Sequence, residues 1–289
     1  IPNIALGQKL ASLPDGPSCD RCTPLTQDNA VTSAITGPDG RFVLKDVPAG
    51  KGIPLIVWLG GWRMQTTVDI EPCVDNALPL GAARLPRNQT EGDIPLTAIA
   101  TGDVDRLQCL MRKIGIEDRE FTEPTGSGRV HMYVSNGAKL SDATPSLTDL
   151  TGVSTGQSAL SRYTQVLLPC EGAPLTKANE SLANLLSYVN QGGRAFATHF
   201  SYTWLFQNGA LGGTAQWMPM LRPPDNQMLV ANIDTSFQKG ADFQSWLQLT
   251  GALTNTMPPQ ITIVEPRVDV TSVTPMGGGQ RWIYADTPA

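Results

Sequence analysis

Hydrophobic and polar residues alternate in several short stretches of the first eighty residues. A period of two is typical of β-strands with one buried face, so we expect strands at residues 31–35, 41–44, 54–59 and 63–68. Gly60 and Gly61 separate the last two stretches and predict a tight hairpin. The chain therefore begins with an all-β part over residues 1–80, which a linker at residues 81–93 joins to the rest.

The pattern changes at Ile94, where strands begin to alternate with helices. Residues 94–102 form a buried apolar stretch, and Asp103 is expected to cap a helix that ends at Gly115. Further strands are expected at residues 130–134, 165–168, 194–198 and 260–264, and further helices at residues 179–191 and 243–249. This repetition predicts an α/β domain over residues 94–289, with a mainly parallel sheet covered by helices.

The composition narrows the class of protein. Only 16% of the residues are charged and the net charge is −5, which argues against a nucleic-acid-binding protein. The 28 glycines and 23 prolines fit a loop-rich secreted protein. The longest apolar run, residues 53–59, is too short to span a bilayer, and the chain starts without the pattern of a signal peptide. We therefore expect a mature or trimmed extracellular protein.

A turn followed by a strand-like segment runs from Thr36 to Gly50. Pro38, Asp39 and Gly40 supply the turn, and residues 41–44 alternate apolar and polar side chains. The string TGPDGRFVLKDVPAG resembles the T-x-x-D-G-x-F-x-L-x-x-V-P-x-G signature of carboxypeptidase-regulatory-like and CnaB-like modules. The resemblance implies an Ig-like β-sandwich at residues 1–80, of a kind usually found without catalytic function in secreted proteins.

Two later segments resemble another family. Residues 163–172 (YTQVLLPCEG) and 185–200 (LLSYVNQGGRAFATHF) are similar to the core of ThuA-like and class I glutamine-amidotransferase-like domains, which have a flavodoxin-like sheet. With residues 84–95 and 192–205, the whole chain resembles a family of secreted bacterial lipoproteins that joins both modules. Members of that family extend beyond both ends of this chain, which implies a sandwich incomplete at its N-terminus and an α/β domain incomplete at its C-terminus.

Cys170 and His199 each follow a predicted parallel strand. Ligands bind at this edge of open α/β sheets, so the two side chains form a candidate nucleophile pair, with Glu171 orienting the imidazole. The amidotransferase pattern is not fully met, because Pro169 replaces the first glycine of the G-x-C-x-G turn and no His-x-Glu pair follows. The alternative interpretation makes Cys170 an unreactive thiol, either buried or bonded to Cys109.

Aromatic residues follow the same edge. Tyr202, Trp204 and Trp217 are candidates for stacking on a sugar or another planar ligand, and the link of ThuA-like proteins to carbohydrate handling supports this. The alternative is that they only pack in the core and loops. His131, within an apolar strand, is expected to be a structural histidine.

Five cysteines in an extracellular composition predict disulfides with one thiol left over. A bridge from Cys19 or Cys22 to Cys73 is expected, because zinc would need further ligands that this part of the chain lacks. No metal or cofactor is expected.

The sequence favours a secreted or cell-surface binding or assembly protein without catalysis, placed at the outer surface of a Gram-negative bacterium. A strand from a partner polypeptide or a second copy would complete the sandwich edge. The alternative is that residues 1–13 fold back as the missing strand. The alternative function is a hydrolase or carbohydrate-processing domain that uses Cys170 and His199.

Overall fold

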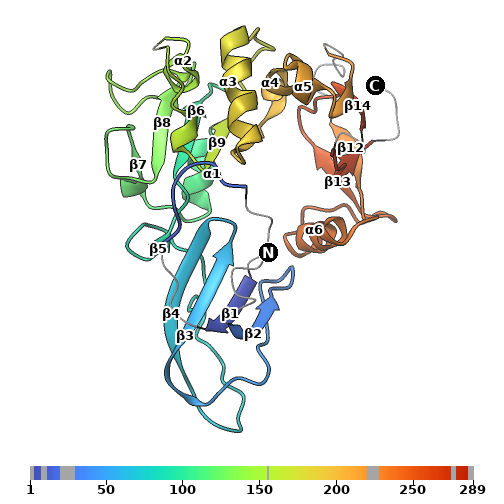
Figure 1. Ribbon diagram of the computed structural model, residues 1–289. Coiled ribbons are helices and arrows are strands. Elements are labelled where there is room, and N and C mark those ends of the chain that lie inside the picture. Colours follow the sequence, from blue (N-terminus) through green and yellow to red (C-terminus); the bar gives the residue numbers. More distant parts are fainter. Residues whose placement is uncertain are drawn as a thin grey trace. The chain divides into compact units, whose positions relative to one another are not determined.

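The chain divides into two structural units in the computed structural model, which describes residues 3–7, 12–19, 30–154, 156–219, 228–274 and 278–285. The first unit comprises residues 1–36 and 42–201, and the second comprises residues 37–41 and 202–289. Figure 1 shows the elements of both. The first unit contains both the antiparallel sheet and the parallel sheet, so the expected linker at residues 81–93 lies within it.

The antiparallel sheet has the strand order β2-β1-β3-β4-β5. Its strands are β1 (Asn3–Gly7), β2 (Ala30–Ile35), β3 (Gly50–Leu59), β4 (Trp62–Ile70) and β5 (Gly92–Asp93). A tight turn at Gly60 (φ +55°) joins β3 to β4, as the sequence predicts. Leu55, Val57 and Met64 form the core on one face of this sheet.

Two expectations for the N-terminal eighty residues are not confirmed by the structure. Residues 41–44 form no strand; Phe42 and Leu44 pack instead from a loop onto the core of the sheet, because burying these side chains does not require strand pairing. The strands described here form one antiparallel sheet, so a β-sandwich is not confirmed. β1 pairs with both β2 and β3, which places the chain's own N-terminal segment inside the sheet.

The second sheet of the first unit is parallel throughout, with the order β10-β9-β6-β8-β7. Its strands are β6 (Thr97–Thr101), β7 (Phe121–Thr122), β8 (Val130–Val134), β9 (Gln165–Leu168) and β10 (Arg194–Ala197). Every residue of the central strand β6 is buried, as expected when both faces of a parallel sheet are covered. The prediction of an α/β part with a parallel sheet is confirmed.

Helices connect the parallel strands. They are α1 (Leu107–Lys113), α2 (Leu147–Thr151) and α3 (Asn179–Asn190), with short 3₁₀ helices at Asp118–Glu120 and Leu160–Arg162. Leu107 and Met111 of α1 join Ile99 and Met132 in the sheet core. α1 begins later than expected: Arg106, not Asp103, precedes its first turn.

A short segment between β1 and β2 contacts the parallel-sheet part. Asp15 forms a two-pronged ion pair with Arg129, next to the start of β8. A Cβ on Gly192, just after α3, would lie 2.4 Å from the backbone of Ser18, so only glycine permits this approach. The chain therefore contacts the parallel-sheet part between β1 and β2, before it has formed the remaining strands of the antiparallel sheet.

The second unit contains short helices and two small antiparallel sheets. Its helices are α4 (Thr203–Phe206), α5 (Gly209–Gly212) and α6 (Gln238–Leu249), preceded by the 3₁₀ helix His199–Tyr202 at the boundary. β11 (Ala215–Trp217) pairs with β14 (Val270–Val273), and β12 (Leu229–Ile233) lies between β13 (Gln260–Ile263) and β15 (Ile283–Tyr284). In the described part of the chain, no helix combines the length and apolar character that a membrane span needs.

Candidate functional site

The direction in which the chain adds strands to the parallel sheet reverses at β6. The chain places β8 on one side of β6 and later crosses to place β9 on the other side. β6 and β9 therefore flank a topological switch point. The crevice beyond the carboxyl ends of two such strands is the usual ligand site of open α/β sheets. Gly102 follows β6 and Cys170 follows β9. A Cβ on Gly102 would lie 2.3 Å from the carbonyl oxygen of Cys170, so the two loops touch at this point.

The structure brings Cys170 and His199 into contact. β9 and β10 are neighbours, with Leu168 opposite Ala197, so the residues that follow them project from the same edge. The sulfur of Cys170 lies 3.2 Å from Nδ1 of His199. Cys170 is fully buried, whereas His199 is half-buried.

Backbone groups fix the position of the sulfur. The N–H of Gly172 donates to Cys170 Sγ at 3.3 Å, and Gly172 has the left-handed φ of +83° that this turn needs. The N–H of Cys170 itself donates to Thr198 Oγ1 at 3.1 Å.

His199 has an unusual backbone conformation, with φ at +43°. A residue other than glycine in this region costs on the order of 1 kcal/mol or more, and such residues cluster at functional sites. The flanking segment is held by Thr198 N–H, which donates to Leu168 O at 3.1 Å, and by Ser201 Oγ, which donates to Pro169 O at 2.6 Å. These bonds tie the His199 loop to the Cys170 loop.

Glu171 points into the protein next to the cysteine. Its Oε1 accepts a hydrogen bond from Ser135, and its Oε2 pairs with Lys177. The side chains of Glu171 and Lys177 are each only 7% exposed. The structure thus gives both oxygens of Glu171 partners other than the imidazole that the sequence assigned to it.

The three aromatic candidates differ in their surroundings. Tyr202 and Trp217 stack with ring centroids 5.8 Å apart and both are half-buried, and Phe206 packs against both rings. Trp204 is only 2% exposed, so its ring presents no open face for stacking in this structure. It is a core residue, because its large apolar ring gains most from full burial.

The cysteines in the described part of the chain are free thiols. Cys19, Cys73 and Cys109 are exposed and Cys170 is buried, so the structure forms neither a Cys19–Cys73 nor a Cys109–Cys170 bridge. Cys22 lies outside the described residues, and so does any bridge from it to Cys73.

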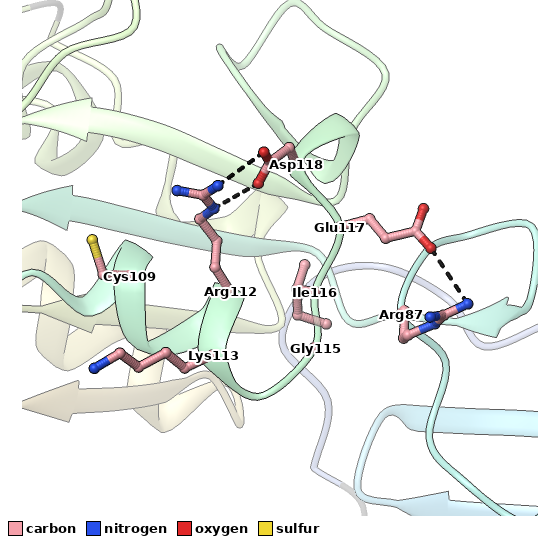
Figure 2. A pocket seen from close by; sticks show the side chains of 8 residues that line it. All are labelled: Arg87, Cys109, Arg112, Lys113, Gly115, Ile116, Glu117 and Asp118. Carbon is pink, nitrogen blue, oxygen red and sulfur yellow. Dashed lines mark hydrogen bonds and ion pairs between the residues drawn. The ribbon is translucent and has the colours of Figure 1, made fainter. Parts of the chain in front are cut away.

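An open hollow of about 500 Å³ lies at the C-terminal end of α1. Its lining includes Arg87, Cys109, Arg112, Lys113, Glu117 and Asp118. Figure 2 shows that these side chains do not converge on one point: Arg112 pairs with Asp118, Arg87 pairs with Glu117, and Cys109 and Lys113 point elsewhere. The hollow therefore lacks a focused set of groups for chemistry.

His131 is a structural histidine, as the sequence predicts. It is 3% exposed, and its Nδ1 lies 3.0 Å from the hydroxyl of Tyr163, which in turn lies 2.9 Å from the hydroxyl of Tyr133. Burial, with a smaller effect of Arg162, lowers the pKa of His131. Burial also raises the pKa of both tyrosines, so these hydroxyls stay protonated.

Sequence reasoning identified Cys170 and His199 but missed the groups that hold them. Gly102 and Ser135 lie far from Cys170 in sequence, and only the strand order brings their loops together, whereas Lys177 lies in the same connection as Cys170. Gly172 carried a signal, because a glycine shortly after a strand end is typical of a turn that needs positive φ.

No family model, no curated protein and no solved structure matches the chain at a significant level.

Proposed function

We propose that the first unit is a thiol-dependent hydrolase or acyl-transfer enzyme in which Cys170 is the nucleophile and His199 its base. The observation that carries this proposal is the 3.2 Å contact between Cys170 Sγ and His199 Nδ1 at the switch point of the parallel sheet. It is supported by the absence of a disulfide at Cys170 and by the N–H of Gly172, which donates to the same sulfur.

The chemistry follows from these groups. His199 takes the thiol proton, and the thiolate attacks the carbonyl carbon of an ester or amide, whose carbonyl electrons move to oxygen. When the tetrahedral intermediate collapses, His199 returns the proton to the departing oxygen or nitrogen, and a thioester remains on Cys170. Water, deprotonated by His199, then hydrolyses the thioester and restores the thiol.

The burial of Cys170 sets a condition on this mechanism. Because the thiol has no exposed surface, a substrate reaches it only after the covering side chains move. The reactivity of the thiol toward a small electrophile measures both its access and its charge state.

Iodoacetamide labelling tests the proposal. We expect Cys170 to be alkylated at about pH 6, where an ordinary thiol is almost fully protonated, and His199→Gln to abolish this low-pH reaction. Cys109, an exposed thiol of the same unit, is the internal comparison in the same peptide map. A chromogenic acetyl ester should also leave an acetyl group on Cys170, and Cys170→Ser should lose it. A Cys170 that stays unlabelled at every pH at which Cys109 reacts would overturn the proposal.

A non-catalytic binding or assembly role is the second candidate. β2 is the last strand in its sheet order, and its side chains Val31 and Ile35 are 63% and 69% exposed. An uncharged apolar strand of this kind favours pairing with another chain. Light scattering after size-exclusion chromatography distinguishes the two: an association that is lost in Val31→Lys supports this role, and a monomer at all concentrations argues against it.

The remaining proposals rest on sequence resemblance and composition. The strand order β8-β6-β9-β10 is that of the first four strands of a flavodoxin-like sheet, which supports the ThuA-like resemblance. The regulatory-like signature at residues 36–50 supports a β-sandwich and a place at the outer surface of a Gram-negative bacterium. The stacked Tyr202 and Trp217 remain candidates for carbohydrate binding.

A further inference from the structure

A buried ion pair lies directly beside the proposed nucleophile. Glu171, the residue after Cys170, pairs with Lys177, and both side chains are 7% exposed. Removing two charges from water costs much of what their attraction returns, so such a pair adds little net stability and is often better explained by a positional role.

The same residue connects three loops at the carboxyl edge of the parallel sheet. Ser135, just after β8, donates to the Glu171 carboxylate, and Asn136 Nδ2 donates to the Glu171 carbonyl oxygen at 2.7 Å. Oδ1 of Asn136 accepts the N–H of Asp103, in the loop after β6, at 3.1 Å. Both ends of Glu171, the side chain and the backbone carbonyl, are therefore held from outside its own loop.

Holding Glu171 also fixes the residue after it. The carbonyl of Glu171 and the N–H of Gly172 belong to one planar peptide unit, so the bond from Asn136 to that carbonyl sets the direction of the N–H. This N–H lies 3.3 Å from Cys170 Sγ.

We propose that Lys177 is a positioning residue, which acts through Glu171 to hold the Gly172 N–H on the sulfur of Cys170. This inference rests on the proposed function. Lys177 neutralises the carboxylate and, with Ser135, holds the Glu171 side chain, while Asn136 holds the carbonyl of the Glu171–Gly172 peptide.

The test uses the full chain with Lys177→Met, which removes the charge at nearly equal length. Because this change leaves Glu171 buried without its ion-pair partner, the double variant Glu171→Gln with Lys177→Met is the second arm. Lys139→Met is the matched control, since Lys139 pairs with Asp142 at the exposed surface. The readout is the rate of Cys170 alkylation as a function of pH, and circular dichroism shows that each variant is folded.

We expect both arms to slow the reaction about tenfold at about pH 6, which is the size of effect expected when a hydrogen bond to a charged group is lost. Lys139→Met should keep the wild-type profile. A folded double variant with the wild-type profile would overturn the positioning role while leaving the nucleophile pair intact. If His199→Gln does not change the wild-type profile, the proposed function itself fails.

Discussion

Replacing Gly102 with alanine would push a methyl group into the contact between β6 and the proposed nucleophile loop. The new Cβ would lie 2.3 Å from the carbonyl oxygen of Cys170, 3.0 Å from its carbonyl carbon and 3.1 Å from Cγ of Pro169. Ordinary contacts between carbon and other heavy atoms are about 3.5 Å, so the Cys170 loop must move by about 1 Å. The two nearest atoms are backbone and the third belongs to a proline ring, so no flexible side chain can absorb this shift.

Two effects of different size follow from this displacement. Overpacking of this kind costs about 1–3 kcal/mol in unfolding free energy, which lowers the melting temperature by a few degrees to about 10 °C. A misplacement of about 1 Å at a reacting group can cost about a hundredfold in rate. We therefore expect Gly102→Ala to remain folded at room temperature while Cys170 loses most of its low-pH alkylation.

Calorimetry measures the first effect, and a peptide map after iodoacetamide treatment measures the second. Gly209→Ala is the control, because its Cβ would meet no atom within 4 Å and its backbone is not in the left-handed region. The reasoning is wrong if Gly102→Ala melts like the wild type and Cys170 reacts at the unchanged rate.

Three further predictions concern the first unit. Because burial lowers the pKa of His131, the unfolded chain binds more protons than the folded chain below about pH 6.5. The stability contributed by His131 should therefore be full above that pH and fall as the pH drops. Urea titrations at several pH values should show a flatter dependence for His131→Gln. Arg63 is 2% exposed and pairs with Asp93 at 2.6 Å, so Arg63→Met should cost about 3–5 kcal/mol in urea unfolding, and a loss under 1 kcal/mol would contradict it. Ser146 and Asp149 form a capping box at α2, so Ser146→Ala should cost about 1 kcal/mol, whereas an unchanged urea midpoint would show that the cap contributes nothing.

The parallel sheet was predictable because its signal is local. Strands such as β6 and β9 are short apolar runs beside clear helical patterns, and the full burial of β6 leaves little choice of residue type there. The neighbourhood of Cys170 and His199 followed from the same pattern, since both residues end strands that a βα repeat places in one sheet.

The rest depends on contacts that the sequence pattern does not encode. Residues 41–44 alternate like a strand, yet Phe42 and Leu44 satisfy their burial from a loop. The start of α1 was also misplaced: Arg106 precedes its first turn, and Asp103 lies in the loop before it, where its N–H bonds to Asn136 of another loop. Trp204 seemed available for a ligand because an aromatic residue near a strand end carries no sign of which side will be buried.

The segment between β1 and β2 has a mechanical consequence. Its ion pair from Asp15 to Arg129 and its close approach from Ser18 to Gly192 cross from one sheet to the other by a route independent of residues 81–93. A protease cut within residues 81–93 would therefore leave the two pieces held together by these noncovalent contacts and by hydrogen bonds between neighbouring strands. Because these contacts link the two sheets, unfolding of one sheet would remove contacts of the other, so the two sheets should lose their structure in a single transition.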